Sequence, residues 1–201
     1  KANHPEQNMA AIPAMAYAAA VTKKINIGCR VFCVDYHLPV VLIKSAMTID
    51  MLSEGRLEFG IGAGWISEEY KALGIKMDEP KIRIDRMGDV VQGIKTFCGE
   101  GPADINNNTL KWSGFSGVPK PSKRPPIMIG GGSPRVLRLA GKEADIVSLN
   151  FNNRSGAIGP DGVSLSTAEE TKKKIGWIKD GAGGRFKDLE LEIGAYFTFV
   201  T

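Results

Sequence analysis

Cysteine and histidine are scarce in this sequence. The chain has three cysteines and two histidines among its 201 residues. Cys29 and Cys33 fall in a strand-like run, which places them roughly 13 Å apart at the usual rise per residue, too far for a disulfide. No Cys/His spacing suits zinc. The sequence therefore predicts neither a disulfide framework nor a metal site, and it indicates a reducing cytoplasm.

Long apolar runs and basic stripes are also lacking. No run is long enough to span a membrane, and the first residues do not resemble a signal peptide. The net charge of +4 comes from dispersed Lys and Arg, and the tight cluster at 172–174 shares a helical pattern with Glu169 and Glu170. That pattern is typical of a solvated helix face. We therefore expect no nucleic-acid partner and no membrane partner.

The sequence does contain a regular alternation of strand and helix patterns. Strands are predicted over 25–34, 57–61, 126–132, 144–150 and 189–200. Helices are predicted over 11–22, from Pro39 to a stop at Gly55, after Ser67, through Ile84, Met87, Val91, Ile94 and Cys98, over 134–143, and from a capping box of Ser166 and Glu169 through Trp177. Residues 103–126 read as a long loop with room for a small hairpin, and 150–165 as a second loop.

The predicted strands are apolar enough to be buried on both faces, which favours parallel βα units. A doubly wound sheet and a (β/α)8 barrel both fit, and periodicity does not choose between them. The chain begins with a helix that has no preceding strand and stops inside a strand, whereas a barrel normally takes about 250 residues. These ends are typical of a segment of a larger barrel, or of a gene product that lacks its outer units, and we expect one domain over 1–201.

Two glycine-rich turns follow predicted strands, where α/β folds bind ligands. The first, "GIGAGW" at 60–65, departs from the dinucleotide fingerprint because Trp65 takes the place of the third glycine. The helix after it begins with Glu68 and Glu69, which suit the helix dipole and would repel a phosphate. The first turn is therefore a poor phosphate site.

The second turn, "IGGGSPRVLRLAG", has the opposite character. Its three glycines at 130–132 let the backbone approach an anion, and Ser133 can cap the helix or donate its hydroxyl. Arg135 and Arg138 add positive charge beside the free N–H groups of a helix start. Phosphate binding and a simple capped βα turn both fit these residues.

These turns resemble the bacterial luciferase-like monooxygenase superfamily, which includes deazaflavin-dependent oxidoreductases. The residues that carry the resemblance are "INIGCRVF", "LSEGRLEFGIGAGWISEEYKALGI" (52–75), "RIDRMGDVVQGIK" (83–95) and "PPIMIGGGSPRVLRLAGKEADIVSLN" (125–150). The later segments "NNRSG" and "KKIGWIKDGAGGRF" are similar to an actinobacterial deazaflavin-dependent subgroup. The resemblance implies a (β/α)8 barrel whose cofactor lies at the carboxyl ends of the strands. It also implies that this chain forms five of the eight strands, the third to the seventh, and lacks the first units and the last unit.

The resemblance also assigns residues to the cofactor. It implies a non-prolyl cis peptide at Arg30-Val31, against the middle ring, with Cys33 beside the ring system. An arginine that reaches solvent or an ion pair, and a small buried cysteine, are the alternatives. Ala63, and less directly Glu68, match the ribityl side. The positions that match the family's phosphate site are Gly131, Gly132, Ser133, Arg135 and Val136.

The activity implied is that of an oxidoreductase that uses coenzyme F420 for hydride transfer with a small organic substrate. An FMN-dependent monooxygenase is the alternative, and a non-catalytic flavin-binding relative is the rival from another class. Trp65 replaces a glutamate of the family's sugar-phosphate dehydrogenases, and it could shape the substrate side or simply pack over the barrel mouth. His37 is the weak acid/base candidate. A homodimer would cover the exposed sheet edges.

Overall fold

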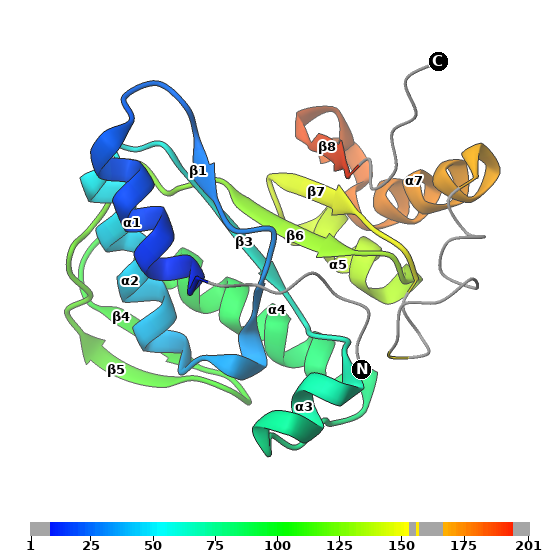
Figure 1. The fold of residues 1–201 in the computed structure, drawn as a ribbon, viewed down its shortest axis with the longest axis horizontal. Helices are drawn as coiled ribbons and strands as arrows, with labels where there is room; N and C mark the ends of the chain where they lie inside the picture. The colour runs from blue at the N-terminus through cyan, green and yellow to red at the C-terminus, as the bar shows by residue number, and fades with distance from the viewer. Residues whose placement is uncertain (1–8, 153–155, 157–166, 195–201) are drawn as a thin grey trace.

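The computed structural model describes residues 9–152, 156 and 167–194. Its main sheet is parallel, in the order β1-β3-β6-β7-β8, with β2 also beside β3 (Figure 1). The strands are β1 (Ile27–Gly28), β2 (Phe32–Cys33), β3 (Leu57–Gly62), β6 (Ile127–Gly131), β7 (Ile146–Leu149) and β8 (Glu190–Ile193). Because β1 and β2 lie in line along one edge of β3, the described sheet is five strands wide, as predicted.

The strand order decides between the two architectures that the sequence left open. Neighbouring strands follow one another in chain order across the sheet, without reversal. A doubly wound sheet reverses its order at a switch point, which brings helices to both faces. A sheet that never reverses keeps its right-handed crossovers on one face. The fold is therefore a parallel α/β sheet of the (β/α) barrel type.

The helices form the outer layer, and each contacts the next along the chain in the order α1, α2, α4, α5, α7 (Figure 1). Their bounds are α1 (Ala11–Val21), α2 (Pro39–Leu52), α3 (Ser67–Leu73), α4 (Pro80–Phe97), α5 (Pro134–Glu143) and α7 (Ala168–Ala182), with short 3-10 helices η1 (Val34–Tyr36) and η2 (Gly183–Asp188). The expected hairpin is present as antiparallel β4 (Ala103–Asn106) and β5 (Lys111–Phe115).

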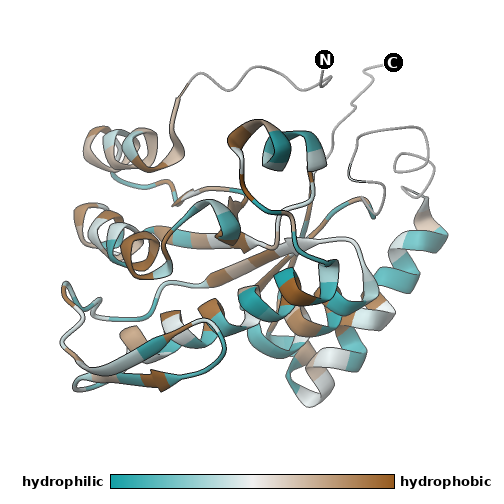
Figure 2. Cartoon of the chain, turned by 90° about the horizontal axis from the view of Figure 1, so that it is seen from below, coloured by the Kyte–Doolittle hydropathy of each residue, from teal (hydrophilic) through white to brown (hydrophobic). Residues whose placement is uncertain are grey.

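The core lies between the sheet and this helical layer, where apolar segments of the strands meet the inward faces of the helices (Figure 2). Alternate residues of a strand point to opposite faces. On β3, Phe59 and Ile61 are fully buried in the core, so Gly60 and Gly62 belong to the other, concave face. The concave face is therefore nearly bare of side chains along the end of β3.

Two local predictions were wrong. Residues 25–34 do not form one strand, because the chain leaves the sheet between β1 and β2. The N-cap of α7 is Thr167, whose hydroxyl accepts from the Glu170 N–H at 3.3 Å, and not Ser166. The run 25–34 is apolar on both sides of the break, so its pattern does not show where the strand stops. Ser166 and Thr167 are both of a residue type that caps helices, so the sequence does not choose between them. Ser166 and the predicted strand beyond residue 194 lie outside the described residues.

Candidate cofactor site

A bulge separates β1 from β2. Gly28 is paired with Glu58, and Phe32 with Ile61. Three residues, 29–31, therefore face only two on β3, which is the geometry of a β-bulge. The bulge contains the predicted non-prolyl cis peptide at Arg30-Val31. Bulges re-aim side chains, and both residues of this peptide point across the sheet.

The Val31 side chain lies over the glycines of the concave face. A Cβ at Gly62 would be 2.6 Å from Val31 Cγ2, and one at Gly130 would be 3.1 Å from Val31 Cγ1. A Cβ at Gly60 would lie 2.1 Å from the Cys29 carbonyl oxygen. The glycines of β3 and β6 therefore accommodate the bulge, which rises above the floor of the sheet at its carboxyl half.

The Arg30 side chain crosses the same face to the far strands. Its Nε donates to Ser148 Oγ at 2.7 Å and to Glu192 Oε2 at 2.9 Å. Strand register places Ser148 beside both Gly130 and Glu192, so the contacts lie on the concave face. Of the two sequence readings, the ion pair is present, at about one-third exposure of each side chain. Contact of Arg30 with a cofactor remains a prediction.

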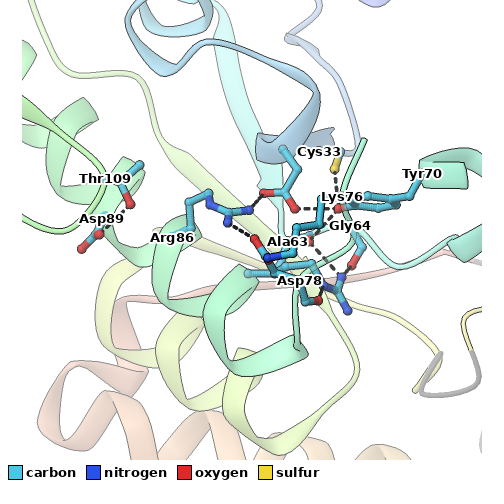
Figure 3. Close-up of polar contacts among 11 residues, drawn as sticks. Cys33, Ala63, Gly64, Tyr70, Lys76, Asp78, Arg86, Asp89 and Thr109 are labelled. Atoms are coloured by element: carbon cyan, nitrogen blue, oxygen red, sulfur yellow. Dashed lines mark hydrogen bonds and ion pairs between the residues drawn. The ribbon is translucent and has the colours of Figure 1, made fainter. Parts of the chain in front are cut away.

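Cys33 and Ala63 meet at a buried tyrosine. Tyr70 on α3 is 1% exposed, and its hydroxyl lies 3.5 Å from Cys33 Sγ and 3.4 Å from the Ala63 carbonyl oxygen. Figure 3 shows the ring pointing from α3 towards Cys33 and the Ala63-Gly64 turn. Burial raises the pKa of the Cys33 thiol, so the group stays protonated at neutral pH. The structure thus joins two predicted cofactor contacts through a residue that the sequence analysis did not single out.

An ion-pair chain supports this cluster. Asp35 accepts from the Tyr70 hydroxyl at 2.8 Å and from Arg86 Nη1 at 2.6 Å. Arg86 also pairs with Asp78, which Lys76 contacts in turn at 2.7 Å (Figure 3). The Asp35 side chain is only 2% exposed. A buried carboxylate with two donors is the arrangement that makes a buried charge tolerable.

Arg83 fixes the backbone of the first glycine turn. Its side chain donates to the carbonyl oxygens of Asp78, Ala63 and Gly64. The guanidinium carbon lies 5.9 Å from the centre of the Tyr70 ring. Arg83 is 6% exposed. A buried arginine therefore satisfies the carbonyl groups that follow β3, and the turn has one defined path.

The second glycine turn is packed more tightly than the sequence suggests. A Cβ at Gly132 would lie 2.1 Å from the Phe151 carbonyl oxygen, and one at Gly131 would lie 2.3 Å from Val136 Cγ1. Ser133 is the N-cap residue of α5, but its side chain makes no capping bond. Arg135 is exposed and pairs with Asp85. These glycines are explained by internal packing, and the phosphate site remains a prediction that rests on the uncapped helix start.

The remaining predicted residues lie at the same edge of the sheet. His37 follows η1, and its ring packs edge-on against Phe32 at 5.5 Å between centroids. Burial lowers the pKa of His37, so the imidazole is neutral at pH 7. Trp65 lies half-buried between β3 and α3, and Glu68 is in the first turn of α3. The catalytic roles of His37 and Trp65 and the cofactor contact of Glu68 stay predictions.

No metal site is formed by His, Cys, Asp and Glu within the described residues. In the same part of the chain, no helix is both long and apolar enough to cross a membrane. A cavity of about 480 Å³ lies between α2 and Phe115, and another of about 290 Å³ lies between α4 and the β4-β5 connection. Predicted cofactor residues line neither cavity.

The fold, together with the residues gathered around the Val31 bulge and Tyr70, defines a barrel-type α/β protein with a candidate site at the carboxyl ends of its strands. The family described as luciferase-like monooxygenase matches residues 2–158. The chain therefore belongs to the luciferase-like monooxygenase family, whose members are oxidoreductases.

Curated relatives agree with this assignment. Pyrimidine monooxygenase RutA of Allorhizobium ampelinum is 27% identical over 151 residues, which cover 74% of this chain and 40% of that protein. An FMNH(2)-dependent dimethylsulfone monooxygenase of Pseudomonas fluorescens is 27% identical over 118 residues, with 59% and 32% covered. The chain spans about half or less of the length of these relatives.

Solved structures share the fold. An F420-dependent secondary alcohol dehydrogenase in complex with an F420-acetone adduct superposes with a TM-score of 0.76 at 18% identity, over 96% of this chain and 56% of that one. Monooxygenase RslO1 from Streptomyces bottropensis gives 0.70 at 22% identity, over 86% and 49%. At these identities the likeness establishes the fold and supports the barrel-type architecture.

Proposed function

We propose that this chain forms the cofactor-binding part of an oxidoreductase that uses coenzyme F420 for hydride transfer with a small organic substrate. The observation that carries the proposal is the concave face at the carboxyl half of the sheet. There Gly60, Gly62 and Gly130 are covered by Val31. A flat ring system needs a smooth apolar wall on one side, and the Val31 bulge supplies such a surface.

The neighbouring groups suit the other parts of such a cofactor. Cys33 and the Ala63 turn lie at the ends of β2 and β3, beside the bulge. The first turn of α5 begins directly after β6, which pairs with β3, and its N-cap side chain leaves the helix N–H groups available. Helix N-termini bind anions through such groups. These features support a placement of the ring at the bulge and of the phosphate at α5.

The bound cofactor would supply the redox chemistry, and with carbon at ring position five a deazaflavin favours two-electron hydride transfer. The protein would hold the ring against Val31 and keep water away. Neutral His37, after β2, could accept a proton from the substrate. Trp65, after β3, could border the substrate. Both roles remain proposals.

FMN is the second candidate cofactor. The specific observation in its favour is the 27% identity to an FMNH(2)-dependent monooxygenase, which exceeds the identity to any F420-dependent protein compared above. A reduced FMN would add oxygen chemistry to the same site. The phosphate group and the ring make similar demands in both cases, so the described residues fit either cofactor.

The deciding experiment is the absorption spectrum and mass of whatever co-purifies with the protein, followed by titration of the stripped protein with F420 and with FMN. We expect tighter binding of F420. Tighter binding of FMN would favour the monooxygenase, and binding of neither would reject the proposed function. Reduction of the bound cofactor, followed by addition of candidate acceptors, then separates an enzyme from a flavin-binding relative, which would show no turnover.

The phosphate placement has its own test. Arg135→Ala and Ser133→Ala should each weaken cofactor binding, since one removes a positive charge and the other a hydroxyl at the start of α5. Lys142→Ala is the matched control, because it removes the same charge from the last turn of α5, at the other end of the helix. Unchanged affinity in both test variants would move the phosphate elsewhere. The homodimer is likewise a proposal, and sedimentation of the purified protein tests it.

A further inference from the structure

We propose that Tyr70 is a positioning residue: its hydroxyl accepts from the Cys33 thiol, and the Ala63-Gly64 turn packs against it, in the arrangement that receives the cofactor. This inference rests on the proposed function, because it concerns two of the predicted cofactor contacts. It adds a residue from α3, outside both glycine turns, and it assigns that residue an indirect role.

The hydrogen bonds around Tyr70 have a definite direction. Asp35 forms an ion pair with Arg86, and the carboxylate of an ion pair can only accept. The Tyr70 hydroxyl has one proton and two acceptors within reach, Asp35 at 2.8 Å and the Ala63 carbonyl oxygen at 3.4 Å, so the proton goes to the nearer and charged Asp35. Burial raises the pKa of Tyr70 far above its ordinary value, so the proton stays on the hydroxyl. It follows that the Cys33 thiol donates to Tyr70, across 3.5 Å.

The same hydroxyl determines the residue at position 64. Gly64 has a φ of +72°, and a Cβ there would lie 2.1 Å from the Tyr70 oxygen and 2.7 Å from Cys33 Sγ. Only glycine allows the turn to pass this close. The last glycine of "GIGAG" is therefore required by Tyr70, and the path of the turn depends on where that ring is held.

Two arginines of α4 complete the arrangement. Arg83 takes the carbonyl oxygens of Ala63 and Gly64, and Arg86 orients Asp35. Loss of the Tyr70 hydroxyl would leave Asp35 short of one donor and Cys33 without its acceptor. Cys33 and the Ala63-Gly64 turn would then lose the hydroxyl that both contact, although the aromatic ring would still fill its buried position.

The matched pair of variants is Tyr70→Phe and Tyr36→Phe. The two rings are neighbours, with centroids 5.2 Å apart, but the Tyr36 hydroxyl donates to exposed Glu69. We expect Tyr70→Phe to weaken binding of F420 or FMN by about tenfold, the loss typical of one buried hydrogen bond, and to shift the absorption band of the bound cofactor. Tyr36→Phe should change neither. Asp35→Asn, which weakens the same chain, should act in the direction of Tyr70→Phe.

A second measurement does not need the cofactor. Hydrogen exchange of the amides of 61–66 and 33–36 in the cofactor-free protein should become faster in Tyr70→Phe and stay unchanged in Tyr36→Phe. If the wild type binds neither cofactor, the proposed function fails, and this exchange alone decides the inference. Unchanged exchange in Tyr70→Phe would overturn it. So would a wild-type affinity and spectrum in Tyr70→Phe when the wild type does bind cofactor.

Discussion

The fit between Val31 and the glycines of the concave face can be tested by a double-mutant cycle. In Gly62→Ala the new methyl group would lie 2.6 Å from Val31 Cγ2, well inside normal contact distance. Overpacking of this kind costs about 1–3 kcal/mol of unfolding free energy. Val31→Ala removes two half-buried methyl groups and should cost about 1 kcal/mol. Because Val31→Ala also removes the obstructing atom, the double variant should be more stable than the two losses together predict.

The expected coupling energy between the two positions is about 1 kcal/mol or more, in the stabilising direction. Urea unfolding of the four proteins, followed by circular dichroism, measures it. Gly60→Ala is the matched control, because its methyl group would meet the Cys29 carbonyl oxygen at 2.1 Å. That obstacle is backbone, so Val31→Ala should give little relief. Additive losses for Gly62→Ala and Val31→Ala would show that the bulge does not lie on the glycine floor.

Three further predictions concern other parts of the chain. Asp145→Asn should cost about 1–3 kcal/mol of unfolding free energy at pH 7, because Arg124 binds this carboxylate through two nitrogens, at 2.7 and 3.0 Å. Burial alone would raise the pKa of Asp145, but hydrogen bonds lower it below its usual value. The stabilisation is therefore present above about pH 4 and is lost as the pH falls through the pKa that Asp145 has in the folded protein. Urea unfolding at pH 7 and at pH 3 should show a smaller difference in stability between wild type and Asp145→Asn at the lower pH. Gly176→Ala should raise the free energy of unfolding by about 0.5–1 kcal/mol, because Gly176 lies within α7 and a Cβ there would meet no other atom. A lower melting temperature in this variant would contradict the prediction. Glu192→Gln should weaken cofactor binding by releasing the Arg30 side chain, whereas an unchanged titration curve would make their ion pair irrelevant to the site.

The order of elements could be predicted from the sequence because each depends on local pattern. Pro39 begins α2 and Gly55, with a φ of +81°, follows its end, as expected from proline at a first helical position and glycine after a helix. The apolar stripe of α4 is buried at Ile84, Met87 and Ile94. These features involve neighbours within a turn or two of helix, which is the range that periodicity describes.

The bulge at Cys29–Val31 could not be predicted from periodicity. An apolar run reads as one strand, and the extra residue becomes visible only from the pairing of Gly28 and Phe32 with β3. The cis peptide at Arg30-Val31 was predicted through the family resemblance alone, and it is confirmed. Local sequence carries no signal for either feature, because both depend on the strand beside them.

The candidate site divides in the same way. The sequence by itself determined which turns contain glycine, and Glu68 and Glu69 led to the prediction that no phosphate binds at the first. Only the tertiary structure decided what those glycines accommodate, namely Val31 at Gly62 and the Tyr70 hydroxyl at Gly64. A glycine in the sequence indicates that another group approaches the backbone closely, but it does not identify that group. The neighbour is set by strand register and helix placement, which bring together residues far apart in the chain.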